Sequence, residues 1–316
     1  MKEIGGYFGL ELASEKEYHT SAIKLNSGRN AFKYILKAQN IKKIYIPNFI
    51  CNSIIEPLIE LFVSYEFYNI DSNFEIIQKI DLLKDERILY VNYFGLKSKY
   101  VKRLADKYQN NLILDNTQDF FEIPLKNIDA IYSPRKFFGV SDGGYLYTNH
   151  LLEDLLTFDE SYIHSAQLLG RTDKEASLFY NEYKKAEQRL INQPIKKMSN
   201  LTNKILSSID YERIKQKRKE NFEYLHNELK EINLLENIDI KSTPFIYPFI
   251  TNDVQLREKL IKNKIYIAKY WSEVLDRESI SNVEIDFVNK LMPLPIDQRY
   301  DFDDMYRILK IIKDNI

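Results

Sequence analysis

Hydrophobic residues in the first half of the chain fall into short runs, separated by stretches in which they recur three and four positions apart. The short runs predict strands, and we place these strands at Lys43–Ile46, Ser64–Tyr68, Ile88–Val91, Leu112–Leu114, Ile128–Tyr132 and Gly144–Thr148. The spaced stretches predict helices over 30–39, 52–61 and 100–108. Several strands are apolar at consecutive positions, which is typical of parallel sheets covered on both faces. We therefore expect an α/β fold, with a mainly parallel sheet sandwiched by helices.

The second half of the chain contains long segments that are rich in charged residues. Helices are predicted over 151–169, 174–191, 211–231 and 301–312, with their charges on solvated faces. Thr243–Ile250 predicts a strand interrupted by proline, which places it at a sheet edge, and Ile265–Ala268 predicts a second strand. The expected organisation is an N-terminal arm over 1–20, a large domain over 21–205 and a smaller C-terminal α+β domain over 206–316.

Composition and charge exclude several classes of protein. The 316 residues include 45 basic and 46 acidic ones, for a net charge of -1, so no single-sign field would attract nucleic acid or anionic lipid. No apolar run reaches the roughly 18 residues that a membrane span needs, and the N-terminus lacks the pattern of a signal peptide. Cys51 is the only cysteine, and the four histidines are too scattered for a metal site. These features predict a soluble cytoplasmic protein without a metal.

Glycine placement indicates which half of the chain binds a ligand. All nine glycines lie at or before Gly170. Because glycine serves where the backbone must approach a ligand closely, we expect a small-molecule site in the first half. In a parallel sheet, such a site lies beyond the carboxyl ends of the strands. Three polar segments fall at strand ends or helix starts there: Asn26–Gly28, Asp115–Gln118 and Ser133–Lys136.

The lysine at position 136 differs from most lysines of this chain, because Phe137 and Phe138 follow it directly. Apolar surroundings disfavour the charged ammonium, so the amine becomes a usable nucleophile. Such an amine suits a Schiff base with a carbonyl cofactor. The alternative is a lysine whose stem lies along a hydrophobic surface while its ammonium stays in water.

Asp115 and the turn at Ser27 and Gly28 offer two further groups that such a cofactor would need. A carboxylate at a strand end can hold the protonated ring nitrogen of a pyridine cofactor; alternatively, Asp115 only begins a turn. Ser27 and Gly28 precede a predicted helix, whose free N–H groups can bind an anion such as phosphate, although a simple N-cap is the commoner role. The fold would bring these residues and Lys136 to one rim of the sheet.

Four segments, in order along the chain, resemble motifs of one family of enzymes. They are Asn26–Phe32, Asp115–Gln118, Ser133–Gly144 and Leu294–Tyr300. In these segments the chain is similar to the DegT/DnrJ/EryC1/StrS family of sugar aminotransferases, which depend on pyridoxal 5'-phosphate and have the fold type I of aspartate aminotransferase. The resemblance implies this fold, this cofactor and the transfer of an amino group, expected from glutamate, to a nucleotide-linked keto-sugar in surface-glycan or related amino-sugar biosynthesis.

The resemblance also implies roles for individual residues. Lys136 would bind the cofactor covalently and move protons during catalysis. Asp115 would pair with the pyridinium nitrogen, and Gln118 would lie near the ring hydroxyl. The phosphate would be held by four residues: Ser27, Gly28, Arg29 and Ser133. A homodimer with shared active sites is implied as well.

Some positions depart from the family pattern. Arg29 stands where threonine is usual, and Asn116-Thr117 replaces two alanines. These departures leave two alternatives to an aminotransferase. One is a cofactor-binding regulatory or scaffold protein of the same fold without turnover, and the other is an α/β enzyme that does not use this cofactor. Some relatives carry histidine in place of the lysine and act as dehydratases, a reaction that Lys136 disfavours here.

Overall fold

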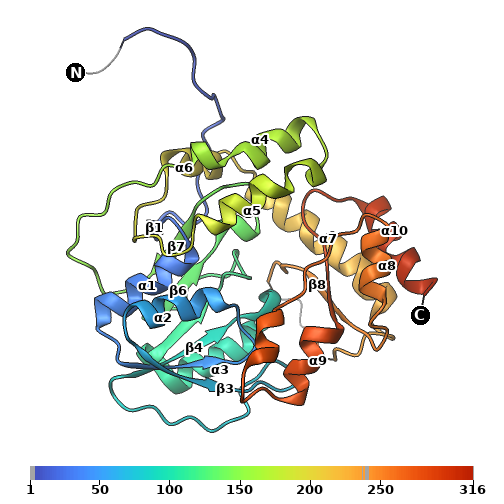
Figure 1. Ribbon diagram of the computed structural model, residues 1–316, viewed down its shortest axis with the longest axis horizontal. Coiled ribbons are helices and arrows are strands. Elements are labelled where there is room, and N and C mark those ends of the chain that lie inside the picture. The colour runs from blue at the N-terminus through green and yellow to red at the C-terminus, as the bar shows by residue number, and fades with distance from the viewer. Residues whose placement is uncertain (1–3, 237, 239–241, 316) are drawn as a thin grey trace.

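A seven-stranded sheet forms the centre of the larger part of the molecule in the computed structural model, which describes residues 4–236, 238 and 242–315 (Figure 1). Its strands are β1 (Ile23–Leu25), β2 (Lys43–Pro47), β3 (Ser64–Tyr68), β4 (Glu86–Val91), β5 (Leu112–Asp115), β6 (Asp129–Tyr132) and β7 (Gly144–Tyr147). They are arranged in the order β1-β7-β6-β5-β4-β2-β3. The five strands from β6 to β3 in this order are parallel, whereas β7 is antiparallel both to β6 and to β1.

Helices flank this sheet, as the hydrophobic pattern predicts. They are α1 (Gly28–Gln39), α2 (Ile55–Glu60), α3 (Ser98–Tyr108), α4 (Ala166–Asp173), α5 (Tyr180–Gln188) and α6 (Asn200–Leu206). Of these, α1 packs against β6 and β7, and α3 packs against β5. The structure therefore confirms the expected fold class, a mainly parallel sheet between helices.

The start of α1 is fixed by the residue that the sequence predicts as its N-cap. Ser27 has an extended backbone, and its hydroxyl oxygen accepts a hydrogen bond from the N–H of Asn30 at 3.0 Å. At the other end, Asn40 adopts the left-handed conformation, with φ of 49°, and closes the helix. The residues from Asn30 to Leu36 are buried, so the helix is held by its packing as well as by its cap.

The C-terminal part has a second, smaller sheet and a core of its own. Its elements are α7 (Tyr211–Leu229), β8 (Tyr247–Ile250), α8 (Leu256–Lys262), α9 (Asn282–Lys290), β9 (Leu291–Leu294) and α10 (Phe302–Lys313). β8 and β9 pair antiparallel, and their side chains join those of α7, α8 and α10 in one buried cluster. α9 differs, since Phe287 and Val288 belong to the core of the larger part. Figure 1 shows α8 and α10, in orange and red, on the side away from the large sheet.

The segment after β7 differs from the two long helices predicted over 151–169 and 174–191. Residues 151–161, all of them described, contain no helix, and the second predicted helix is divided into a 3₁₀ helix over 176–179 and α5. The reason is backbone pairing at the sheet edge. The N–H of Asp159 donates to the carbonyl oxygen of Lys197, and the N–H of Lys197 donates to that of Thr157, both at 2.8 Å. Helical prediction fails here because the segment's apolar residues bury no common face.

The predicted strand Ile265–Ala268 is also wrong. These residues join no sheet in the described part of the chain, and the Arg257 side chain donates to the carbonyl oxygen of Ala268. β8 pairs instead with β9, which the sequence leaves unassigned because Pro293 interrupts it. Pro248 and Pro293 lie opposite each other. In a two-stranded sheet each strand has a free edge, so a proline that lacks an N–H is tolerated in both.

The N-terminal arm is anchored to the larger part by His19. Its imidazole is 2% exposed and lies between two oxygen atoms: Nε2 is 2.7 Å from the carbonyl oxygen of Phe120, and Nδ1 is 3.0 Å from the hydroxyl of Tyr147. Burial lowers the pKa of His19 to about 4. The ring is therefore neutral at pH 7, and because a carbonyl oxygen only accepts, Nε2 carries the proton.

The part of the arm before Glu17 is mostly exposed. Residues 4–16 contain no helix or strand, as the sequence predicts, and Figure 1 shows the first of them extending away from the helices and the sheet. Residues 1–3 of the predicted arm lie outside the described residues, as do 237, 239–241 and 316 of the predicted C-terminal domain. The domain boundaries at 20 and 205 stay predictions.

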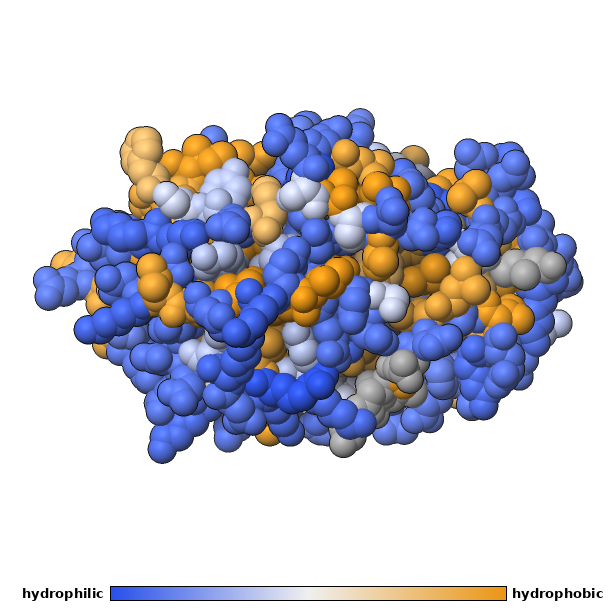
Figure 2. Space-filling view, turned by 90° about the horizontal axis from the view of Figure 1, so that it is seen from below, coloured by the Kyte–Doolittle hydropathy of each residue, from blue (hydrophilic) through white to orange (hydrophobic). Residues whose placement is uncertain are grey.

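The molecular surface is mostly hydrophilic on the face that Figure 2 shows, where hydrophobic residues form separate patches among polar ones. Large apolar side chains are also exposed along the segment that contains α4 and the start of α5: Tyr162, Ile163, Leu169, Leu178 and Tyr180. Among the described residues, helices are either too short or too polar to cross a bilayer.

We expect the protein to lose stability as the pH falls from about 6.5 towards 4, because of His19. An unfolded histidine takes up a proton near pH 6.5, whereas the folded one does so near pH 4. The unfolded state therefore binds more protons in this window, and the stability present above pH 6.5 is lost as the pH falls, by up to about 3 kcal/mol. In urea unfolding, His19→Gln should show a flatter pH dependence, while His150→Gln, at an exposed position, should follow the wild type. Equal slopes in His19→Gln and the wild type would contradict this account.

Candidate active site

The ends of two neighbouring strands place Asp115 and Lys136 on the same rim of the sheet. β5 ends at Asp115, and the adjacent, parallel β6 ends at Tyr132. The chain then passes directly into a 3₁₀ helix over 134–136, whose last residue is Lys136. Pro134 takes the first position of this helix, where its fixed φ suits the turn and its missing N–H costs nothing. The lysine therefore follows the strand end within one turn.

The Lys136 amine lies beside Thr117 and is accessible to solvent. Its Nζ donates to the hydroxyl oxygen of Thr117 at 2.7 Å. The side chain is exposed, yet the protein around it removes enough water to lower the pKa of the amine. The charge of Asp115 raises this pKa and opposes the shift only in part, while Arg135 lowers it further. The neutral, nucleophilic amine is therefore populated at a lower pH than that of a lysine in water.

Thr117 connects the carboxylate of Asp115 to the amine of Lys136. Oδ1 of Asp115 accepts a hydrogen bond from the N–H of Thr117 at 2.9 Å, while the hydroxyl of Thr117 accepts one from Lys136. The two charged groups thus flank a single residue, close enough to contact one small molecule. Sequence reasoning did not assign Thr117 to the site. Its only signal was its place beside Asp115, where it departs from the family pattern.

The turn before α1 lies against the same residues. A Cβ atom on Gly28 would come within 3.3 Å of Cγ2 of Thr117 and 3.9 Å of Cβ of Ser133. Glycine at 144 permits this close packing, since a Cβ there would lie 2.4 Å from the carbonyl carbon of Ser27. The first N–H groups of α1 have no acceptor within the helix and carry the positive end of its dipole. Ser27, Gly28 and Ser133 therefore lie together at the N-terminus of α1, the kind of helix end at which anions bind in proteins.

Two of the predicted site residues have side chains engaged elsewhere. Nε of Arg29 is 3.2 Å from the carboxylate of Glu56, and Nη1 donates to the carbonyl oxygen of Leu190. Oε1 of Gln118 accepts a hydrogen bond from the N–H of Phe94 at 3.0 Å. Phe94 has a φ of 58°, so this bond supports a strained, left-handed backbone. The residues that do come together are Ser27, Gly28, Asp115, Ser133 and Lys136.

A buried carboxyl group at Asp119, four residues beyond Asp115, was not predicted. Burial raises its pKa well above the usual value. Asn92 Nδ2 donates to Oδ2 at 2.9 Å, and the hydroxyl of Ser242 lies 3.2 Å from Oδ1. That hydroxyl gives its single proton to the carbonyl oxygen of Gly95 at 2.6 Å. A protonated Asp119 can donate a hydrogen bond to the Ser242 oxygen, whereas a carboxylate there would face that oxygen without a proton between them.

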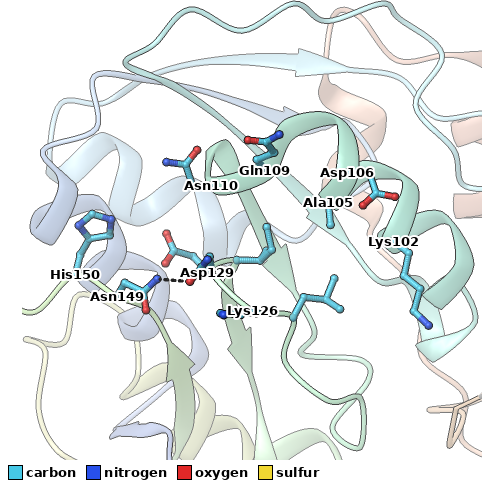
Figure 3. A pocket seen from close by; sticks show the side chains of 12 residues that line it. Lys102, Ala105, Asp106, Gln109, Asn110, Lys126, Asp129, Asn149 and His150 are labelled. Atoms are coloured by element: carbon cyan, nitrogen blue, oxygen red, sulfur yellow. Dashed lines mark hydrogen bonds between the residues drawn. The ribbon is translucent and has the colours of Figure 1, made fainter.

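A cavity of about 680 Å³ lies at the opposite edge of the sheet, where β6 begins (Figure 3). It is lined by the end of α3, by residues 125–129, and by Asn149 and His150 after β7. The side-chain amide of Asn149, which Figure 3 labels, donates to the side-chain oxygen of Asn127 at 3.2 Å. The cavity contains none of the predicted site residues. Because ligands of parallel sheets bind at the carboxyl ends of strands, we place the functional site at Lys136 instead.

No family model matches the sequence, and no curated protein matches it. Solved structures do match. A DegT DnrJ EryC1 StrS aminotransferase from Brucella abortus is 15% identical, with a TM-score of 0.64, over 93% of this chain and 85% of that chain. NtdA from Bacillus subtilis, with bound cofactor PMP, is 15% identical, with a TM-score of 0.66, over 93% and 72%. The GDP-4-keto-6-deoxymannose-3-dehydratase ColD, a mutant with bound GDP-perosamine, is 16% identical, with a TM-score of 0.64, over 92% and 88%.

Likeness at this low identity shows the fold. The chain has the fold of the DegT/DnrJ/EryC1/StrS-type sugar aminotransferases along nearly its whole length. The resemblance found in four sequence segments is confirmed as a likeness of fold, and it extends through both sheets rather than being confined to the segments that suggested it.

We expect Asp119→Asn to stabilise the protein, and more so at higher pH. A raised pKa means that the folded state holds a proton that the unfolded chain releases near pH 4. The wild type therefore loses stability as the pH rises above that value, whereas asparagine does not titrate. Its Nδ2 can donate to Ser242, and its oxygen can accept from Asn92. Urea unfolding at pH 5 and pH 8 should show a gain at pH 8 on the order of 1 kcal/mol or more.

The matched control is Asp142→Asn, because this buried carboxylate only accepts hydrogen bonds. The N–H and the hydroxyl of Ser199 donate to it at 2.7 Å each, and Thr202 donates as well. The amide of Asp142→Asn would direct an N–H group towards these donors, so the variant should lose about 1–3 kcal/mol of folding stability at either pH. Destabilisation of the same size by Asp119→Asn would refute a protonated Asp119.

Proposed function

We propose that this protein is an aminotransferase that uses pyridoxal 5'-phosphate to transfer an amino group from glutamate to a nucleotide-linked keto-sugar, in surface-glycan or related amino-sugar biosynthesis. The Lys136 amine carries the proposal: it is accessible, has a lowered pKa and shares Thr117 with a buried carboxylate. The likeness of fold to sugar aminotransferases supports it.

The residues around Lys136 suit this cofactor group by group. The phosphate matches the N-terminus of α1, where Gly28 packs against Thr117 and Ser133. The ring nitrogen needs a carboxylate nearby, which Asp115 offers, and the aldehyde needs a neutral amine, which Lys136 offers. When bound, the cofactor supplies an electron sink that stabilises negative charge on a substrate carbon.

The chain's own residues would bind, orient and move protons. Lys136 would hold the cofactor covalently and, once freed by the amino donor, carry a proton between the cofactor and substrate carbons. Its lowered pKa suits both tasks, because a group that takes and returns a proton works best near the ambient pH. Thr117 would orient Nζ through its hydroxyl, and Asp115, which is 5% exposed, would keep a negative charge beside the ring nitrogen.

The sugar substrate is proposed from the structural neighbours and from the lysine itself. Bound GDP-perosamine is present in the structure of ColD, and bound PMP is present in that of NtdA. The family resemblance associates dehydration with a histidine in place of the lysine. Lys136 therefore favours amino transfer over dehydration.

A cofactor-binding protein without turnover is the second candidate. One observation favours it: the Arg29 guanidinium, which stands in the phosphate turn, is directed to Glu56 and to the carbonyl oxygen of Leu190 rather than to the place for an anion. Without a contact from Arg29 the phosphate would be held less tightly, although the N–H groups of α1 would still bind it.

A homodimer with shared active sites is part of the proposal. The exposed apolar side chains along 162–180 form the kind of surface that other protein chains cover. The helix that follows this surface reaches the site, because Glu187 of α5 pairs with Arg135, the residue before Lys136. In the arm, Tyr7 and Phe8 are 98% and 92% exposed.

In solution, the protein should have twice the mass of its 37.6 kDa chain. Replacing Ile163 and Leu169 by serine should shift the equilibrium towards the monomer, because the apolar area that a partner covers would be reduced. Replacing Ile77 and Leu83, which are similarly exposed elsewhere, should leave the mass unchanged. Sedimentation equilibrium measures this, and a wild type that is monomeric at all concentrations would rule the dimer out.

Borohydride reduction in the presence of pyridoxal 5'-phosphate should attach the cofactor to Lys136, as located by peptide mass spectrometry. Lys136→Ala should lose this label while keeping the unfolding temperature of the wild type. Lys97→Ala is the matched control, because burial also lowers the pKa of Lys97, which lies 3.6 Å from Glu75. The control should keep the label on Lys136. Labelling that survives Lys136→Ala would refute the proposed role.

Addition of glutamate to the loaded protein separates the two candidates. An aminotransferase should lose its long-wavelength absorption and release 2-oxoglutarate, and a keto-sugar nucleotide should restore the absorption. A protein that is labelled at Lys136 but unchanged by amino donors and keto-sugars would fit the second candidate. A protein that takes up no cofactor would fit an α/β enzyme of another kind.

A further inference from the structure

The loop Asn48–Asn52 follows β2 at the rim of the sheet that carries Lys136. It leads through Cys51 into a 3₁₀ helix over 52–54 and then α2. Glu56 of α2 is 3.2 Å from Nε of Arg29 in the first turn of α1. Because β2 is parallel to β4, and β4 to β5, the loop leaves the sheet at the same rim as Asp115. The loop therefore lies on the rim that carries Lys136, and the helix that follows it contacts the first turn of α1, which would hold a phosphate.

One side chain from the other end of the sequence holds this loop. The guanidinium of Arg277 donates through Nη1 to the carbonyl oxygen of Asn48, and through Nη2 to the carbonyl oxygen of Ile50 at 2.9 Å and to Oδ1 of Asn52 at 2.8 Å. These three oxygens belong to alternate residues of a single loop. A planar guanidinium with several fixed donors can bind all three at once, whereas a single ammonium cannot.

Neighbours of Arg277 reinforce the contact without replacing it. The ring of Trp271 lies 4.9 Å from that of Phe49. The N–H of Asn52 donates to Glu273 at 3.4 Å, and the amide of Asn48 donates to the carbonyl oxygen of Ser279 at 3.1 Å. The segment 271–279 thus lies along the loop, and Arg277 is the residue in it with the most hydrogen bonds to the loop's carbonyl groups.

The large sheet makes few hydrogen bonds to this loop that could replace those of Arg277. The N–H of Asn48 donates to the carbonyl oxygen of Tyr68, and the hydroxyl of Tyr93 donates to that of Phe49, both at 2.8 Å. These bonds hold the start of the loop. Ile50 and Asn52, which flank Cys51, are held by Arg277. Removal of the guanidinium would therefore free the second half of the loop.

We propose that Arg277 is a positioning residue of the Lys136 site: its guanidinium fixes the Asn48–Asn52 loop and so sets the wall of the site on the Cys51 side. The inference rests on the proposed function, because it assigns the loop to the cofactor's surroundings. Arg277 would touch neither cofactor nor substrate. It would act on cofactor retention from the C-terminal part of the chain, through the loop.

The test uses Cys51 as a reporter, since it is the only cysteine. N-ethylmaleimide is added to the full-length protein with and without pyridoxal 5'-phosphate, and alkylation of Cys51 is followed by mass spectrometry. In the wild type, the cofactor should slow alkylation. In Arg277→Gln, alkylation without cofactor should be about tenfold faster, as a released loop allows, and protection by the cofactor should need a higher cofactor concentration.

Arg257→Gln is the matched control. Arg257 also gives its donors to backbone carbonyl oxygens, those of Ala268 and Leu291, and burial lowers its pKa as it does that of Arg277. Among the described residues, its hydrogen-bond partners lie outside the Asn48–Asn52 loop. This variant should match the wild type in Cys51 alkylation and in cofactor affinity. Arg277→Lys, which keeps the charge but not the planar fork, should lie between Arg277→Gln and the wild type.

The outcomes distinguish this inference from the proposed function. If borohydride labels Lys136 but Arg277→Gln and Arg257→Gln alkylate at equal rates with equal cofactor affinity, the positioning role is refuted and the function stands. If the wild type takes up no cofactor, the proposed function fails, and so does the inference for the site. If Arg277→Gln does not fold, as judged by thermal unfolding, the comparison of Arg277→Lys with Arg257→Gln decides in its place.

Discussion

The site depends on an amine and a carboxylate held at the ends of two adjacent parallel strands, with one threonine between them. Parallel strands end at the same edge of a sheet, so Asp115 and Lys136 meet without any long connection. Loss of hydration is the largest effect on the Lys136 amine and lowers its pKa, and the charge of Asp115 limits this shift. Neither effect alone would give an amine that is both reactive and able to take back a proton.

The antiparallel end of the sheet serves the same site in a different way. β7 brings Gly144 so close to Ser27 that no side chain fits between them, and the N–H of Gly143 donates to the carbonyl oxygen of Asn26 at 2.7 Å. These contacts press the start of α1 against the ends of β5 and β6. The glycines after Lys136 therefore matter through the helix that they allow to approach.

Sequence reasoning succeeded where one local signal decided the structure. Consecutive apolar residues identified the buried strands β4, β5 and β6, and the Ser27 side chain identified the start of α1. Sequence reasoning failed where residues far apart in the sequence determine the local structure. Backbone pairing with Lys197 overrode the helical pattern before α4. β9 was missed because a proline is acceptable only in a strand with a free edge, and that edge is a property of the assembled sheet.

The site shows the same division. Lys136, Asp115 and the turn at Ser27 can be found from residue type and place, whereas the side-chain direction of Arg29 depends on Glu56, which belongs to another helix. The residue types of Thr117 and Arg277 give little local signal, since a threonine in a turn and an arginine in a charged segment are both ordinary. Their roles come from residues that the fold brings to them.

The pairing of β1 with β7 has a consequence for the order of events on the ribosome. Leu25, just before the turn that opens α1, is in register with Gly144. The first strand thus has no place in the sheet until the seventh has been synthesised and has emerged. A nascent chain can assemble the parallel strands first, but the turn that opens α1 is completed only when this late strand joins, so a ligand that depends on this turn can be captured only after synthesis of the whole sheet.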